Sequence, residues 1–343
     1  MEKDVSVIIP VYNAENYITQ CIESLLNQTL RECEFIFIND GSTDNSEKII
    51  EDYKKLDDRI TLINQENQGV SIARNRGIGV STGEYVGFVD ADDYIESDMY
   101  EILYNSAKQS DCDAVISNFK WEIEGHKIIT KYSFPVDIVL KTDYIEQDLL
   151  PYFLKEDNLN TVCNKIYRNN LIREKNVEFP EKVVLGEDGM FNIQFFSNAT
   201  SVKYIDYTGY HYREVVGSAT KNISEKDYFK RAVEVYTMEL PKIYIDKIDN
   251  VRMDQLKAIK FINSVMSYIH IYFTPCENVS FNKRYEYVKN MVRNKYVREA
   301  LPIYYRETYS MLGKYEKFVV YLVKIKSTIG LYCVTAYSRF RNQ

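Results

Sequence analysis

VSVIIPVYNAENYITQCIESLLNQTL, residues 5–30, combines two patterns that together indicate the fold. Residues 5–11 form a mostly apolar, β-branched run, which predicts a buried strand. Residues 15–28 carry apolar side chains at helical spacing, which predicts a helix directly after that strand. A buried strand followed by a helix is the repeating unit of parallel sheets, so this stretch favours an α/β fold.

The same unit repeats as far as residue 118. Strands are predicted at 34–40, 60–64, 84–90 and 113–118, and helices at 44–56, 69–80 and 97–109. This order predicts parallel strands with helices on both faces, and ligands bind beyond the carboxyl ends of the strands in such sheets. Polar clusters follow the first four strands: PVYNAE, NDGSTD, NQENQG and DADD. We therefore expect one ligand site at this edge of the sheet.

The remaining chain differs in pattern and in charge. Residues 119–224 are less regular, with a hairpin predicted in WEIEGHKIITKYSF and a helix at 142–154. Residues 1–224 contain 22 Lys and Arg against 38 Asp and Glu, a net charge of −16, whereas residues 225–343 contain 21 against 12, a net charge of +9. We predict a domain of residues 1–224, with halves at about 1–118 and 119–224, and a basic, Tyr-rich helical domain of residues 225–343.

Composition argues against several classes of protein. The six cysteines are dispersed without a C-x-x-C pair, which disfavours a zinc site or a dithiol centre and fits a reduced, cytoplasmic compartment. No basic leader with an apolar segment precedes the first strand, so a secretion signal is not predicted. No window of about 18 residues is free of charge, so a membrane-spanning helix is not expected.

GFVDADDY, residues 87–94, places three carboxylates at the end of a predicted strand. Like charges there are unfavourable unless a cation, hydrogen bonds or solvent compensates them. Oxygen-only ligands suit hard cations such as Mg²⁺ or Mn²⁺. On an extended strand Asp90 and Asp92 would share a face, and Asp93 would point away. The pattern favours a metal site, and the alternative is a solvated turn with an N-cap.

Two further segments carry candidate binding residues at the same edge. Asp40, in FINDGSTDNS, could accept hydrogen bonds from a nucleobase or ribose, or it could organise the turn. Arg74 and Asn75 lie in a predicted helix whose start is marked by Gly69, and a helix N-terminus with an arginine favours a diphosphate. The alternative for that helix is an exposed surface with a salt-bridged arginine.

Candidate residues also occur later in the chain. Glu187 and Asp188 open an apolar helix, where the dipole favours negative charge, and a carboxylate there could also act as a general base. Among the three histidines, His126 and His270 are interpreted as structural or exposed. His211 is the histidine that could contact a metal or a phosphate.

These segments together resemble the inverting family 2 glycosyltransferases of the GT-A fold, particularly bacterial enzymes that build capsule, exopolysaccharide or teichoic acid. The resemblance runs in order across about residues 4–220 and rests on VSVIIPVYNAENYITQCIESLLNQTL, FIFINDGSTDNS, NQGVSIARNRGI, GEYVGFVDADDY, NKIYR, GEDGMF and YHYREVVGS. The ordered combination is far more specific than any single motif.

The resemblance implies a nucleotide-sugar donor, usually a uridine diphosphate sugar, bound across the ends of the first four strands. It also implies a set of donor-binding residues: Pro10, Tyr12, Asn13, Glu15, Asp40, Gln68, Arg74, Asn75, Asp90 and Ala91. Within this set Asp40 would read the uracil and Arg74 would lie near the diphosphate. Mn²⁺ or Mg²⁺ would be held by Asp92, the principal ligand of the D-x-D motif, with Asp90 and His211 as further ligands.

The resemblance also implies the chemistry. Asp188, with Glu187 beside it, would deprotonate the acceptor hydroxyl as this attacks the anomeric carbon opposite the leaving diphosphate. A single displacement of this kind inverts the anomeric carbon. Two positions depart from the family pattern: Cys163 stands where relatives often carry an aromatic residue, and His211 falls where the family varies. Lys165 and Arg213 are alternative diphosphate-side or structural residues.

The C-terminal segment suggests a further partner. Residues 280–343 hold 13 Lys and Arg against 4 Asp and Glu, interleaved with Tyr and Phe. Such a segment could lie in an anionic membrane interface on the inner face of the cell membrane, near a lipid-linked glycan acceptor. The alternative is a terminal helix packed on the catalytic domain or on another subunit of a homo-oligomer. Nucleic acid is not an expected partner, because the overall charge is negative and no binding module is recognisable.

Two other functions compete with glycosyl transfer. One is a non-catalytic protein that binds a nucleotide sugar and serves as the partner of another transferase, which would bind the donor without turnover. The other is a nucleotidyltransferase that makes the sugar nucleotide, but the Gly-rich, basic N-terminal loop expected there is absent from the sequence.

Overall fold

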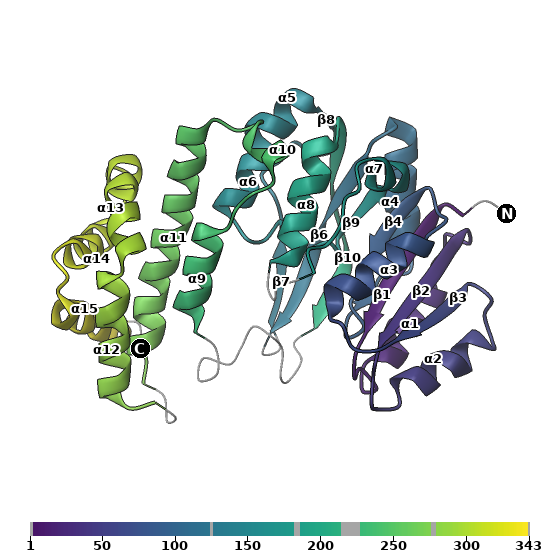
Figure 1. Ribbon diagram of the computed structural model, residues 1–343, viewed down its shortest axis with the longest axis horizontal. Coiled ribbons are helices and arrows are strands. Elements are labelled where there is room, and N and C mark those ends of the chain that lie inside the picture. Colours follow the sequence, from purple (N-terminus) through teal and green to yellow (C-terminus); the bar gives the residue numbers. More distant parts are fainter. Residues whose placement is uncertain (1–2, 124–125, 182–185, 214–226, 276–278, 342–343) are drawn as a thin grey trace. The chain divides into compact units, whose positions relative to one another are not determined.

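The computed structural model describes residues 3–123, 126–181, 186–213, 227–275 and 279–341 (Figure 1). The chain divides into two compact units. Unit 1 comprises Met1–Phe153, Asp157–Ser218 and Pro241–Lys247, and unit 2 comprises Leu154–Glu156, Ala219–Leu240 and Ile248–Gln343. The domain boundary predicted at residue 224 lies outside the described residues. The sequence did not indicate that Pro241–Lys247 belongs to unit 1.

Unit 1 is built on one mixed sheet, in which ten strands are described. The strands are β1 (Val5–Val11), β2 (Cys33–Asp40), β3 (Ile60–Gln65), β4 (Tyr85–Phe88), β5 (Tyr94–Ile95), β6 (Ala114–Ile123), β7 (His126–Thr130), β8 (Val139–Lys141), β9 (Lys165–Arg168) and β10 (Ser201–Arg213). Their order is β3-β2-β1-β4-β9-β6-β10-β5, with β7 beside β6 and β8 beside β10. The predicted α/β class is confirmed, and the hairpin predicted after residue 120 is β6 with β7.

The central strand β1 explains why the first half of the sheet is parallel. It pairs in parallel with β2 on one side and with β4 on the other, for example Ile8 with Ile36 and with Phe88. All three side chains are buried. A parallel strand covered on both faces requires an almost continuous apolar sequence, which is the pattern seen in residues 5–11.

The helices of unit 1 include those predicted at 15–28, 44–56, 69–80 and 97–109. They are α1 (Ile18–Leu26), α2 (Ser46–Lys54), α3 (Val70–Val80), α4 (Met99–Ser110), α5 (Thr142–Tyr144), η1 (Ile145–Leu149), α6 (Leu150–Lys155), α7 (Asn169–Glu174), α8 (Glu187–Asn198) and α10 (Lys242–Ile245). The helix predicted at 142–154 is therefore three consecutive helical segments, with η1 a π-helix in the middle.

Strand β9 was not predicted, and it changes the sheet. It lies antiparallel between β4 and β6, so the fifth predicted strand is not a direct neighbour of the fourth. Because β9 is antiparallel, its first residue, Lys165, lies toward the carboxyl ends of its neighbours, opposite Ile116. The loop that precedes β9 therefore reaches the edge where the ligand site is expected.

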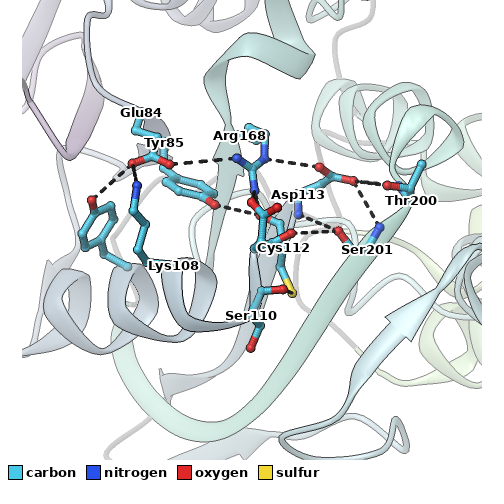
Figure 2. A network of polar contacts seen from close by, with 11 residues as sticks. Glu84, Tyr85, Lys108, Ser110, Cys112, Asp113, Arg168, Thr200 and Ser201 are labelled. Carbon is cyan, nitrogen blue, oxygen red and sulfur yellow. Dashed lines mark hydrogen bonds and ion pairs between the residues drawn. The ribbon is translucent and has the colours of Figure 1, made fainter.

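The other end of β9 is fixed by a polar network (Figure 2). Arg168 donates to Asp111 Oδ1 at 2.7 Å, and its guanidinium lies 3.3 Å from Asp113 and 3.9 Å from Glu84. The carboxylate of Asp113 also accepts a hydrogen bond from the backbone N–H of Thr200 at 2.7 Å. One arginine thus links β9 to the amino ends of β4, β6 and β10.

Unit 2 is helical in the part that the structure describes. Its helices are α9 (Tyr228–Thr237), α11 (Asn250–Phe273), α12 (Phe281–Arg293), α13 (Lys295–Thr308), α14 (Lys314–Lys324) and α15 (Thr328–Arg341). Buried side chains from α11 to α15 form one core: Ile262, Val265, Ile269, Val292, Leu301, Val320, Val323 and Leu331. Within the described ranges, no helix is both long enough and apolar enough to cross a membrane.

Candidate active site

The loops after β1 and β2 are joined by hydrogen bonds at the carboxyl edge of the sheet. Asn13 adopts a left-handed backbone with φ 49°, which asparagine tolerates better than most residues. Its side-chain oxygen accepts a hydrogen bond from Thr43 N at 2.8 Å, and Glu15 Oε2 accepts one from Asn45 N at 3.0 Å. Asn13 and Glu15 therefore shape the loops, and Tyr12, which directly precedes Asn13, is left 54% exposed.

Asp40, at the end of β2, is a buried carboxylate that holds the start of α3. Its Oδ1 accepts hydrogen bonds from Gln68 N at 2.8 Å and Gln65 Nε2 at 2.7 Å, and its Oδ2 accepts one from Gly69 N at 2.8 Å. Gly69 has φ 92°, a conformation that favours glycine. The turn-organising role of Asp40 is therefore present in the structure, and its contact with a nucleobase stays a prediction.

The remaining predicted donor residues have separate surroundings. Pro10 is half-buried in β1 beside Ile38 of β2, and Ala91 is buried. Asn75 uses its side-chain amide to bind the backbone of Phe179, with Nδ2 donating to the carbonyl and Oδ1 accepting from the N–H, both at 2.8 Å. Asn75 thus fixes the segment before α8.

Arg74 is the centre of the charged part of the site. It is 3% exposed, and it donates from Nη1 to Asp188 Oδ1 at 2.6 Å and from Nη2 to Asp90 Oδ1 at 2.8 Å. Glu187 Oε1 lies 3.5 Å away, and the guanidinium lies over the ring of Phe179. Burial alone would lower the pKa of Arg74, but Asp188 and Asp90 raise it above its ordinary value, so the arginine stays charged. The predicted residues Arg74, Asp90, Glu187 and Asp188 are therefore brought together.

The DADD segment is a turn and not an extended strand. Strand β4 ends at Phe88, and Asp93 N donates to Asp90 O at 3.0 Å. Asp93 is buried, where its carboxylate accepts hydrogen bonds from Tyr210 Oη at 2.5 Å and from Arg213 N at 2.7 Å. Burial, followed by the charges of Asp90 and Asp92, raises the pKa of Asp93. Asp93 is thus an internal structural acid.

Asp92 and His211, both predicted metal ligands, have different surroundings. Burial and the neighbouring Asp90 raise the pKa of Asp92 to about 6. His211 is buried, its ring stacks on Tyr94 at 4.5 Å, and its Nε2 lies 2.7 Å from Glu96 Oε1. Among the residues that the structure describes, no three His, Cys, Asp or Glu side chains are arranged to hold a metal ion. Asp90 and Asp92 are therefore candidate ligands without a third protein ligand beside them.

Asp188 has the properties of a candidate general base. It lies in the first turn of α8, after Gly186, which has φ 104°. Burial raises the pKa of Asp188 to about 7, with Glu187 and Asp90 adding to the rise and Arg74 opposing it. Its side chain is 21% exposed, so part of the carboxylate is open to solvent. A carboxylate with a pKa near neutral pH can accept a proton efficiently there.

Lys165 is a functional candidate whose surroundings the sequence did not reveal. Its ammonium is buried and donates to Leu159 O at 3.1 Å, Thr161 O at 2.5 Å and Asn164 Oδ1 at 2.8 Å, and burial lowers its pKa to about 7. The loop held in this way presents Val162 N to Asp188 Oδ2 at 3.4 Å. A lysine directly before the apolar pair Ile166 and Tyr167 of β9 is the sequence signal that could have identified this buried position.

Arg213 and Cys163 surround the same edge. Arg213 donates to Gln20 Oε1 at 2.6 Å and lies over the rings of Tyr17 and Tyr94. Cys163 is buried, and burial and Asp90 raise the pKa of its thiol. Both residues therefore act in the packing of the site in this structure.

Comparisons with known proteins identify relatives of this chain by sequence and by fold. The sequence profile described as Glycosyl transferase family 2 matches residues 6–174. The uncharacterised glycosyltransferase EpsJ of Bacillus subtilis (strain 168) is 39% identical over 218 residues, which are 63% of this chain and 63% of that protein. The uncharacterised glycosyltransferase YibD of Escherichia coli (strain K12) is 34% identical over 255 residues, 71% of this chain and 72% of that protein. The match thus spans less than two thirds of EpsJ.

The fold also has a close match among solved structures. The crystal structure of S. aureus TarS 1–349 in complex with UDP-GlcNAc has a TM-score of 0.65 and 21% sequence identity, and the match covers 98% of this chain and 91% of that chain. At this level of identity the match supports the GT-A fold expected from the sequence.

Proposed function

The chain belongs to glycosyltransferase family 2, and from this premise we propose that it transfers a sugar from a nucleoside diphosphate donor to a hydroxyl group, with inversion at the anomeric carbon. The arrangement around Arg74 carries the proposal. Arg74 joins Asp90, at the donor edge of the sheet, to Asp188 at the start of α8. The guanidinium of Arg74 therefore holds both the proposed donor-side carboxylate, Asp90, and the candidate base, Asp188.

The donor we propose is a uridine diphosphate sugar. TarS was crystallised with UDP-GlcNAc and with UDP, which supports a uridine nucleotide for a chain of the same fold. The exposed ring of Tyr12 offers a surface on which a nucleobase can stack. The loops that carry Asn13 and Glu15 are already ordered by the hydrogen bonds to residues 42–46, so little ordering is needed on binding.

The acceptor we propose is a hydroxyl of a growing or lipid-linked surface polysaccharide. TarS is named a poly(ribitol-phosphate) beta-N-acetylglucosaminyltransferase, and a poly(ribitol-phosphate) beta-glucosyltransferase of Bacillus spizizenii is 31% identical over 215 residues. These names support a polymer acceptor for this chain.

Asp90 and Asp92 fit a divalent cation. They offer the carboxylate oxygens that Mn²⁺ and Mg²⁺ prefer, and the raised pKa of Asp92 marks a carboxylate whose ionised form a nearby cation would stabilise. A bound cation would offset negative charge on the leaving diphosphate. His211 is engaged by Glu96, so we do not include it in the proposed ligand pair.

The residues of the chain then have defined roles in the transfer. Asp188 takes the proton of the acceptor hydroxyl while the hydroxyl oxygen forms a bond to the anomeric carbon. The bond between that carbon and the diphosphate oxygen breaks on the opposite side, and its electron pair leaves with the diphosphate. Arg74 positions Asp188, and the loop held by Lys165 presents Val162 N to the other carboxylate oxygen. One displacement of this kind inverts the sugar.

The experiment is a comparison of donor binding and sugar release over a panel of nucleotide sugars, with and without Mn²⁺ or Mg²⁺. We expect Asp188→Asn to keep donor binding and to lose transfer by roughly 10²- to 10⁴-fold. Asp92→Asn is expected to weaken the metal-dependent part of donor binding. Asp58→Asn, an exposed acid outside the site, is the matched control and should change neither.

The outcomes separate the competing functions. Metal-independent binding that ignores Asp92 would contradict the proposed cation pair. Tight donor binding by the wild-type chain without hydrolysis or transfer to any glycan would favour the non-catalytic partner of another transferase. Absence of binding to every nucleotide sugar would contradict the proposed donor class.

A further inference from the structure

Helix α14 has two faces of opposite character. Val319, Val320 and Val323 are buried in the core of unit 2. On the other face Phe318, Tyr321 and Ile325, which directly follows the helix, are 51%, 52% and 51% exposed. Residues spaced by three and four positions lie on one side of a helix, so these three side chains form a continuous exposed stripe.

Two lysines border this stripe and connect it to α13. Lys317 Nζ lies 5.3 Å from the centre of the Tyr309 ring, and Lys324 Nζ lies 5.0 Å from the centre of the Tyr305 ring. The two tyrosine rings stack on each other at 4.2 Å. We call the surface formed by Lys317, Phe318, Tyr321, Lys324 and Ile325 the α14 stripe.

Within the part of the chain that the structure describes, the lysines of the α14 stripe have no acidic partner. No carboxylate of the described residues lies within 4.0 Å of either ammonium, and the acids nearest in sequence are engaged elsewhere. Glu316 accepts a hydrogen bond from Gly313 N at 2.8 Å, and Glu307 pairs with Arg306 at 2.7 Å. The surrounding segment, residues 280–343, carries 13 Lys and Arg against 4 Asp and Glu. The exposed stripe is therefore apolar and aromatic at its centre and cationic along its border.

We infer that the α14 stripe is a docking surface for an anionic lipid bilayer. Aromatic side chains prefer the headgroup level of a bilayer, and lysine stems can cover apolar surface while their ammonium groups reach lipid phosphates. Unpaired lysines next to exposed aromatic rings match this environment in both polarity and charge. A second copy of the same stripe is a poorer occupant, because it would bring lysines toward lysines.

The direct test is binding of the full-length chain to vesicles. We expect the protein to sediment with vesicles of phosphatidylcholine and phosphatidylglycerol and not with vesicles of phosphatidylcholine alone, and added salt should release it. The double variant Lys317→Gln/Lys324→Gln should lower the partition coefficient roughly 10- to 30-fold. Lys230→Gln/Lys283→Gln removes the same charge from α9 and α12 and should leave binding within a few-fold of wild type.

A fluorescence measurement reports insertion at a defined site. Tyr321→Trp places an indole in the stripe, and Phe281→Trp places one at another exposed position of unit 2. With brominated lipids in the anionic vesicles, we expect added quenching for Tyr321→Trp and not for Phe281→Trp, each measured against wild type with its single Trp121. Neither measurement needs donor or acceptor, so the result is independent of the proposed transfer.

Three results would overturn the inference. One is a wild-type chain that binds neither kind of vesicle. Another is equal loss of binding in the two double-lysine variants, which would indicate unspecific charge attraction. The third is a wild-type oligomer in solution that dissociates in Lys317→Gln/Lys324→Gln or in Phe318→Ser, which would identify the stripe as a subunit interface.

Discussion

Arg74 donates to Asp188 Oδ1 at 2.6 Å, although the two residues are 114 positions apart in the sequence. The same guanidinium donates to Asp90 at 2.8 Å, so the candidate base and the proposed donor-side acid share one buried cation. A rearrangement of any one of the three groups therefore changes the surroundings of the other two. The arrangement makes Arg74 a positioning residue for the whole site.

Replacement of Arg74 should affect both stability and transfer. Arg74→Met leaves Asp188 and Asp90 without their cation, which we expect to lower the free energy of unfolding by on the order of 3 kcal/mol. Arg74→Lys keeps the charge but loses the planar fork that binds two carboxylates, so it should lower kcat more than it lowers stability. Chemical denaturation and transfer rates measure the two effects. Arg76→Met, an exposed arginine on the same helix, is the control, and an equal loss there would contradict a special role for Arg74.

The rate of transfer should rise with pH. Only the ionised form of Asp188 can accept a proton, and its pKa is raised to about 7, so at saturating donor kcat should increase as pH rises through about 7. Glu187 adds to the raised pKa of Asp188 by like-charge repulsion. Glu187→Gln should therefore lower this pKa and move the increase in kcat to lower pH. The measurement is a pH profile of kcat for both proteins.

A control separates the base from other groups that titrate nearby. Glu178→Gln removes an exposed acid before α8 and should leave the profile unchanged. Burial and Asp90 raise the pKa of Asp92 to about 6. Donor binding through Asp92 should therefore change with pH near 6, and it is measured separately from kcat. A kcat profile that is flat from pH 5 to 9, or one that Glu187→Gln moves upward, would contradict Asp188 as the base.

The sequence was sufficient to predict the elements that depend on local patterns. The runs at residues 5–11 and 34–40 are buried strands because each is apolar over most of both faces, and the polar clusters after them are joined by hydrogen bonds at one edge. Strand β9 could not be found in this way, because KIYR is too short to show a period and its place between β4 and β6 is fixed by long-range contacts.

The candidate site was predictable in residue type but not in arrangement. Asp90, Asp92 and Asp188 were identified because clustered acids at strand and helix ends carry a local signal. The turn that buries Asp93 depends on Tyr210, and the pairing of Asp188 depends on Arg74. Neither partner is near in sequence, so spacing alone left each of these acids with two open interpretations.

Asp40 allows the two interpretations of its role to be separated. Asp40→Asn replaces one accepting oxygen by a donor and removes a hydrogen bond from a carboxylate to an N–H of the 65–69 segment, which should cost about 1–3 kcal/mol of stability. If Asp40 acts only through the turn, KM should rise by the same factor for a uridine donor and for a donor with another base. If it also reads uracil, the ratio of the two KM values should change. Steady-state kinetics with both donors, with Asp58→Asn as control, measures this ratio.

Two glycines in α3 provide a matched test of how closely this helix packs on the sheet. A Cβ at Gly77 would clash with Ile8 Cγ2 in the buried centre of β1, whereas a Cβ at Gly79 would have no neighbour within 4 Å. Gly77→Ala should therefore destabilise unit 1 by about 1–3 kcal/mol through overpacking. Gly79→Ala should stabilise it by about 0.5–1 kcal/mol, because alanine has the higher helix propensity. Denaturation followed by the fluorescence of the single Trp121 in β6 measures both effects. Similar effects of the two substitutions would contradict the close approach of α3 to β1, and with it the packing that holds Arg74 at the site.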